Sequence, residues 1–177
     1  MYSENASDVL PNDLTACIST LPLSAGAYAL QLHLSHSHRI QVGKFAQAIF
    51  PTGEYIYLGS AHGPGGLRAR LGRHLRGAGK PHWHIDYLRC VAEVQSAGYM
   101  LVQEEDSKHP TECTWSQALS KFPRAYIPLA SFGAGDCHSG CQAHLVGFPA
   151  SNMDILEKLQ NTYSLVIVNC QDLKTTG

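Results

Sequence analysis

The 177-residue sequence predicts a mixed α/β (α+β) domain, with a small and mainly antiparallel central sheet flanked by helices. Residues 27–34 and 39–43 are short apolar or alternating runs on either side of a polar turn, which predicts a β-hairpin. A Pro-Thr-Gly turn at residues 51–53 precedes an aromatic-rich strand at 55–58. Leucines at i, i+4 and i+8 in residues 67–76 are typical of an amphipathic helix.

The rest of the chain continues this mixed pattern. A short helix or turn is expected at residues 82–88, a strand at 94–102, a helix at about 111–121 and a loop rich in Gly and Cys at 130–144. A helix at 153–161 and a strand at 163–168 follow. We therefore expect three parts: an N-terminal arm (1–22) with a small apolar cluster, a main domain (23–148), and a C-terminal helix-strand extension (149–177) packed on that domain.

Composition restricts the class of protein. The chain is 44% hydrophobic and 15% charged, with a net charge of −1. It contains no apolar run of the roughly 18 residues that a membrane span needs, and its polar N-terminus is not a signal peptide. These features predict a cytoplasmic protein with no membrane partner, and they argue against a protein that coats nucleic acid indiscriminately.

Positive charge is nevertheless concentrated in one segment. Six of the 13 Lys and Arg residues lie between positions 68 and 89, where Asp86 is the sole acid. On a helical wheel, Arg70 and His74 lie one turn apart and should lean over the sheet edge. A solvated helix face is the simple alternative, but guanidinium groups also grip phosphate bidentately. We expect further phosphate contacts from Arg68, Arg73 and Arg76.

Tyrosines are predicted beside this basic helix. Tyr57 and Gly59 share one face of their strand by the period of two, and Tyr28 lies on a strand of the same sheet. A strand tyrosine is usually a core residue, so each one alone says little. Two of them next to Arg70 and His74 suggest a reactive site.

Short motifs then resemble a known family. Gly-Ala-Tyr at residues 26–28 and Tyr-Leu-Gly at 57–59 resemble the signature tripeptides of the GIY-YIG nucleases. The turn that begins at Gly59 and Ser60, followed by Leu-Gly-Arg-His at 71–74, resembles that family's entry into its arginine helix. The family's arginine then corresponds to Arg70, and its metal-binding glutamate to Glu112.

The resemblance is closer to a small prokaryotic branch of that superfamily, the Uri-type endonuclease-like proteins. The branch motifs are Gly-Pro-Gly-Gly-Leu at 63–67, His-Trp-His-Ile-Asp-Tyr-Leu at 82–88, Glu-Cys at 112–113 and Phe-Gly-x-x-Asp-Cys…Cys…His-Leu at 132–145. The match covers about residues 26–148. Ala27 and Leu58 replace the signature isoleucines, and the loop after Gly59 is longer than in the homing and repair members.

The resemblance implies a DNA endonuclease that hydrolyses phosphodiester bonds. Glu112 would hold one Mg²⁺ or Mn²⁺ ion, and Arg70 would stabilise charge on the phosphate. Tyr28 or Tyr57 would relay a proton from the attacking water, with His74 or His82 as partner. Because the ordinary tyrosine pKa is about 10, Arg70 and the metal would have to lower it. The DNA could be branched, single-stranded or duplex, and a partner protein could supply specificity.

Two further groups have more than one interpretation. His82, His84 and Asp86 would share one side of an extended segment and form a second metal set, or one histidine would cap or hydrogen-bond the core backbone while Asp86 orients the other histidine. His84 could also contact phosphate. The second group consists of Cys137, Cys141 and His144. These ligand types are suited to zinc, with Cys113 and His138 as additional candidates. The alternative is that the cysteines are buried thiols without a metal.

Two functions other than a nuclease remain open from the sequence. One is a nucleic-acid-binding module of the same fold that does not cleave. The other is a zinc-stabilised interaction domain in which the Cys/His segment is the functional part.

Overall fold

The computed structural model describes residues 12–77, 79–102, 111–149 and 154–168. Residues 1–11 of the predicted arm, and residues 150–153 and 169–177 of the predicted extension, lie outside the described residues. None of the helices in the described ranges is long and apolar enough to cross a membrane.

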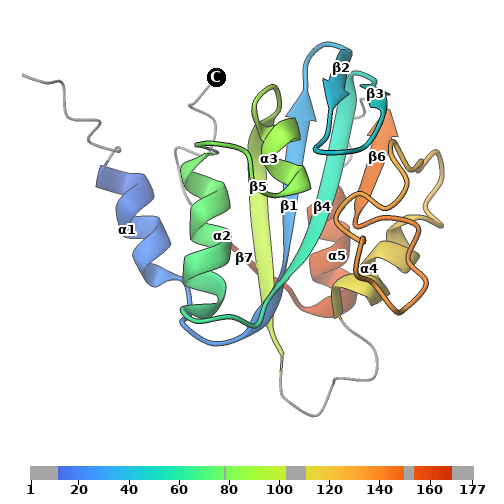
Figure 1. Ribbon diagram of the computed structural model, residues 1–177. Helices are drawn as coiled ribbons and strands as arrows, with labels where there is room; N and C mark the ends of the chain where they lie inside the picture. Colours follow the sequence, from blue (N-terminus) through green and yellow to red (C-terminus); the bar gives the residue numbers. More distant parts are fainter. Residues whose placement is uncertain (1–11, 78, 103–110, 150–153, 169–177) are drawn as a thin grey trace, which may run out of the picture.

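The described chain forms one five-stranded sheet, a separate two-stranded sheet and five helices, so the predicted fold class is confirmed (Figure 1). The large sheet has the strand order β6-β4-β1-β5-β7, and every pairing in it is antiparallel. Its strands are β1 (Gly26–Leu34), β4 (Gly53–Ala61), β5 (Glu93–Leu101), β6 (Leu145–Pro149) and β7 (Val166–Ile167). The small sheet pairs β2 (His38–Gln41) with β3 (Gln47–Phe50). The helices are α1 (Asn12–Thr20), α2 (Gly66–Arg76), α3 (His84–Arg89), α4 (Thr111–Leu119) and α5 (Ile155–Tyr163).

Helices cover both faces of the large sheet (Figure 1). Alternation along the strands divides the side chains between two apolar clusters. Tyr28 and Tyr57 belong to the cluster that contains the leucines of α2 and α3. Ala27 and Leu58 face the other way, toward α4 and α5. The two signature tyrosines therefore lie on the α2 face, as the period of two predicts.

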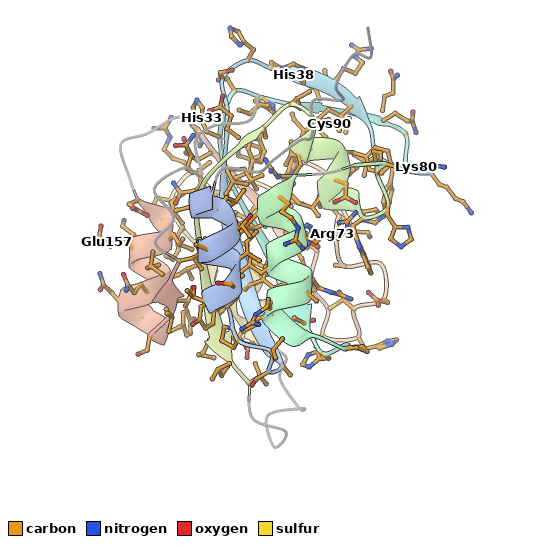
Figure 2. The ribbon with its side chains drawn as sticks, turned by 90° about the vertical axis from the view of Figure 1, so that its left-hand side faces the viewer. His33, His38, Arg73, Lys80, Cys90 and Glu157 are labelled. Atoms are coloured by element: carbon orange, nitrogen blue, oxygen red, sulfur yellow. The ribbon has the colours of Figure 1, made fainter. Side chains whose placement is uncertain are left out.

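The N-terminal residues of the described chain are part of the main core. Leu14, Ile18 and Leu21 are buried in the same cluster as the α2 leucines, and α1 lies beside α2 (Figure 2). The helices approach closely at Gly72, where an added Cβ would lie 2.7 Å from Ile18 Cγ2. A small residue in α2 thus allows this packing.

The predicted hairpin between residues 27–34 and 39–43 is wrong. β1 already pairs with β4 along one edge and with β5 along the other, so neither edge is free. β2 pairs instead with β3, a strand that the pattern of residues 47–50 did not reveal. β6 was also not predicted, although it closes the edge of β4.

Candidate functional site

A pocket with a volume of about 720 Å³ opens beside the C-terminal half of β4. β6 pairs with β4 only as far as Tyr57. Beyond it, the Leu58 N–H donates to the His144 carbonyl at 2.9 Å, and residues 132–144 fold over the exposed edge. The pocket is therefore located where the sheet edge changes from strand pairing to a loop.

Most residues expected at an active site line this pocket. They come from β1, β4, α2, the residues at and just before the start of α3, the start of α4 and the loop of residues 131–144. The predicted residues in the lining are Tyr28, Tyr57, Gly59, Ser60, Arg70, His82, His84, Glu112, Cys137 and His144. The predicted residues that are not part of the lining are Arg68, Arg73, His74, Arg76 and Cys141.

Gly59 makes room for a tyrosine. A Cβ on Gly59 would lie 2.5 Å from both Cζ and the hydroxyl oxygen of Tyr28, and the two residues are paired across β1 and β4. Because Tyr28 is 1% exposed, its ring has no space to retreat. The glycine thus sets the position of the Tyr28 hydroxyl.

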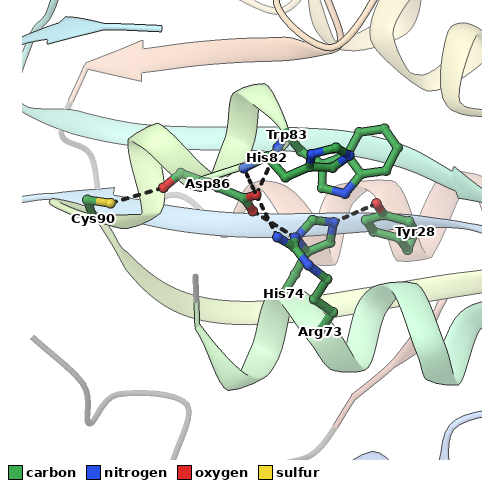
Figure 3. A network of polar contacts seen from close by, with 7 residues as sticks. All are labelled: Tyr28, Arg73, His74, His82, Trp83, Asp86 and Cys90. Carbon is green, nitrogen blue, oxygen red and sulfur yellow. Dashed lines mark hydrogen bonds and ion pairs between the residues drawn. The ribbon is translucent and has the colours of Figure 1, made fainter. Parts of the chain in front are cut away.

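Behind the pocket, Tyr28 contacts a buried histidine (Figure 3). The Tyr28 hydroxyl lies 3.0 Å from Nε2 of His74. The other ring nitrogen, Nδ1, lies 3.9 Å from a carboxylate oxygen of Asp86. A proton on Nδ1 suits the nearby carboxylate and leaves Nε2 free to accept from Tyr28. Burial lowers the pKa of His74 to about 4, against the opposing effect of Asp86, so the ring is neutral at pH 7.

Asp86 holds α2, α3 and the segment before α3 together. It forms a bidentate pair with Arg73, at 2.9 and 2.7 Å, and accepts from the backbone N–H groups of His82 and Trp83. Burial alone would raise its pKa, but these hydrogen bonds lower it to about 2. The second metal set proposed for His82, His84 and Asp86 is not formed, because the carboxylate is occupied by these donors at the start of a helix.

The two pocket tyrosines are neutral. Burial raises the pKa of Tyr57 to about 12, although Arg70 opposes the rise. Burial also raises the pKa of Tyr28, again against Arg70. Arg70 does act to lower the pKa of both tyrosines, as expected from the sequence. The rise caused by desolvation is larger, so both pKa values lie above the ordinary value.

Arg70 is the arginine of α2 that belongs to the pocket. Its guanidinium carbon lies over the Trp83 ring, 4.6 Å from the ring centre, which is a cation–π contact. Trp83 also lines the pocket and is 39% exposed. We did not predict a role for Trp83 from the sequence, because an isolated tryptophan carries no spacing signal.

The other arginines of α2 have different surroundings. Arg68 Nε donates to the carbonyl of Leu21 at 2.8 Å, and Arg73 pairs with Asp86. Arg76 is exposed in the last turn of α2. The basic segment therefore contributes one guanidinium to the pocket lining rather than a continuous row.

A cluster of three thiols and one imidazole lies in the wall of the pocket. Cys113 Sγ is 3.5 Å from Cys137 Sγ and 3.4 Å from Nε2 of His144. Together with Cys141, the ligand atoms all lie within 4.8 Å of one another. This set could hold a metal ion such as zinc. It contains the three predicted residues and Cys113, whereas His138 lines the pocket outside the set.

The pKa values of the three thiols shift in different directions: those of Cys113 and Cys141 are raised, chiefly by burial, and that of Cys137 is lowered. Burial would also raise the pKa of Cys137, but backbone hydrogen bonds from Cys141 and Ser139 outweigh it and lower the pKa. Burial lowers the pKa of His144, which favours the neutral, ligating form of the ring.

Sequence comparison places the chain in a family. The model of a domain of unknown function, DUF123, matches residues 27–167. The chain belongs to this family. The match spans all of the residues that line the pocket and the Cys/His cluster. A search of the curated proteins found no match to this DUF123 chain, and a search of the solved structures found none either.

Proposed function

We propose that this DUF123 protein is a divalent-metal-dependent endonuclease that hydrolyses phosphodiester bonds in DNA at the pocket beside β4. The observation that carries the proposal is the convergence of Tyr28, Tyr57, Arg70 and Glu112 in one lining. These four residues are among those that the resemblance to the GIY-YIG nucleases singles out. They span 85 positions of the chain, from residue 28 to residue 112.

The donor set fits a hard divalent ion. Glu112 is half-buried in the first turn of α4, and Asp136 lines the same pocket. Mg²⁺ and Mn²⁺ commonly bind through one or two carboxylates, waters and substrate phosphate oxygens. When bound, such an ion would neutralise charge on the phosphate that is being cleaved.

Arg70 is suited to the same phosphate. Its planar donors can form two parallel hydrogen bonds with phosphate oxygens, and the cation–π contact with Trp83 limits its rotation. As charge builds on the equatorial oxygens, this guanidinium stabilises the transition state.

Tyr28 is better placed than Tyr57 to move the proton. As the water oxygen bonds to phosphorus, its proton passes to the Tyr28 oxygen, and the Tyr28 proton passes to Nε2 of His74, 3.0 Å away. The resulting imidazolium faces Asp86. The phosphorus–oxygen bond to the leaving group breaks, and that oxygen takes a proton from solvent. This relay needs no free phenolate, which agrees with the raised pKa of Tyr28.

The test is cleavage of labelled duplex, single-stranded and branched DNA in the presence of Mg²⁺ or Mn²⁺. We expect cleavage by the wild type and a loss of at least about 100-fold for Arg70→Ala. Arg39→Ala is the matched control, because Arg39 is an exposed arginine outside the pocket lining. Absence of cleavage on every substrate, with retained binding, would favour the non-cleaving module instead.

A further inference from the structure

The Cys/His cluster has the geometry of a closed metal site. In a tetrahedron with Zn–S bonds of about 2.3 Å, neighbouring sulfur atoms lie about 3.8 Å apart. The two contacts that Cys113 makes within the cluster, 3.5 and 3.4 Å, are near this edge length, and the whole set is within 4.8 Å. Four protein ligands complete a tetrahedron and leave no open position for water.

A disulfide does not explain the arrangement. The 3.5 Å between Cys113 Sγ and Cys137 Sγ is far longer than a bonded S–S distance of about 2.05 Å. Cys113, Cys137 and Cys141 are all free thiols. Any one disulfide among them would leave the third sulfur and the His144 ring without a reason to converge.

The loop of residues 131–144 has little regular structure to hold it against α4, and a bound metal ion would supply a link between the two. Residues 131–144 contain no helix or strand, yet they form one wall of the pocket. They are attached to α4 by a bond from Ser116 Oγ to the Ala143 carbonyl, 2.6 Å, and one from Gln117 to the Ser139 carbonyl, 3.1 Å. Cys113 is on α4, and the other three ligands are in this loop.

We propose that the cluster binds one structural zinc ion that fastens the loop of residues 131–144 to α4. Three sulfurs and one imidazole are soft ligands, which select zinc over the hard ion expected at Glu112. The zinc ligands Cys113 and Cys137 directly follow Glu112 and Asp136 in the chain. The ion therefore also holds both pocket carboxylates in place, while taking no part in the reaction itself. The proposal stands whether or not the protein cleaves DNA.

Metal analysis of protein purified from zinc-supplemented medium is the first test. We expect about one zinc per chain in the wild type, and a loss of at least about tenfold in Cys137→Ser and Cys141→Ser. Cys90→Ser is the matched control and should keep its zinc, because Cys90 lies on the side of the molecule that carries α1 and α2 (Figure 2) and its sulfur donates to the Asp86 carbonyl. A wild type with iron in place of zinc, or cysteine variants with full zinc, would overturn the proposal.

A second measurement does not depend on whether the variants fold. Wild-type protein is stripped of metal with a chelator and a thiol reductant, and Co²⁺ is then added. We expect the thiolate-to-cobalt charge-transfer band and intense visible bands of tetrahedral coordination, both removed by one equivalent of Zn²⁺. Hydrogen exchange of the stripped protein should rise in residues 131–144 and remain unchanged in β1. Absence of the cobalt bands, or unchanged exchange in the loop, would contradict the proposal.

Discussion

Tyr28 is a core residue to which the proposed reaction also gives a role in proton transfer. It is 1% exposed and packs in the cluster beneath α2, yet its hydroxyl borders the pocket and contacts His74. The alternation of β1 is enough to place its ring on the α2 face. The contact with Nε2 of His74 depends on how α2 crosses the sheet, which the strand pattern does not determine.

Removal of single hydroxyl groups distinguishes the two pocket tyrosines. Tyr28→Phe keeps the ring and removes the proton path to His74, so we expect the single-turnover cleavage rate to fall by about 100-fold to 10,000-fold. Tyr57→Phe should lose less, because the contacts described for Tyr57 include no bond to a base. Equal losses, or a larger loss for Tyr57→Phe, would contradict the assigned relay.

His74 should make the stability depend on pH. Its pKa is about 4 in the folded protein, through burial, and about 6.5 when unfolded. Between these values the unfolded chain binds more protons, so the free energy of unfolding must rise with pH from about 4 to 6.5. Denaturation with urea at several pH values should show a smaller rise in His74→Gln. An identical pH dependence in the two proteins would contradict the buried neutral ring.

At the scale of elements, the start of α3 is fixed by one carboxylate. Asp86 is the third residue of α3 and accepts from the N–H groups of His82 and Trp83, which is the carboxylate half of a capping box. The usual signature of such a box begins with Ser, Thr, Asp or Asn, and Trp83 stands there instead. Because Trp83 is not a usual capping residue, the sequence did not mark where the helix begins. In an extended segment, the spacing of His82, His84 and Asp86 suggested metal ligands instead.

Asp86→Asn should separate α3 from α2. The amide loses the charge that pairs with Arg73 and satisfies fewer of the donors around it, so we expect a loss of about 2–3 kcal/mol in the free energy of unfolding. Glu93→Gln on β5 is the control, because Glu93 is exposed. Urea titrations that give the same midpoint for wild type and Asp86→Asn would contradict the structural role of this carboxylate.

Element types were easier to predict than partners. The leucine stripe of α2, the β1 and β4 strands and the loop before β6 all follow from local pattern. Strand pairing does not follow from local pattern. A strand such as residues 38–41 has the same alternation of apolar and polar residues whether its neighbour is β1 or β3. The same holds for the candidate site. Motifs in the sequence were enough to single out Arg70 and Glu112, whereas the contact of Arg70 with Trp83 could be found only from the three-dimensional structure.

For the whole molecule, the basic charge is less available than its clustering suggests. Net charge is −1, and Arg68 and Arg73 are engaged with the Leu21 carbonyl and Asp86. The sequence showed where positive charge gathers but could not show which groups were already occupied. A Lys or Arg used internally is indistinguishable from a free one until the fold brings its partner to it.

DNA binding should consequently depend weakly on salt. Each phosphate contact adds about 0.9 to the slope of log affinity against log salt concentration for duplex DNA. We expect a shallow slope for the wild type, a decrease of about 0.9 in Arg70→Ala, and no change in Arg39→Ala. Fluorescence anisotropy of labelled duplex DNA, titrated at several salt concentrations, measures this slope. A decrease in Arg39→Ala instead would place the nucleic acid on another face.

The proposed activity is metal-dependent hydrolysis at the pocket beside β4. Its most direct test is cleavage of end-labelled DNA by wild type and Glu112→Gln, each with Mn²⁺, with Mg²⁺ and with chelator. The glutamine keeps the size of the side chain and removes its charge. We predict cleavage by the wild type only when a divalent ion is present, and a loss of at least about 100-fold in Glu112→Gln at saturating metal. Cleavage that persists in chelator, or a variant as active as the wild type, would contradict the account.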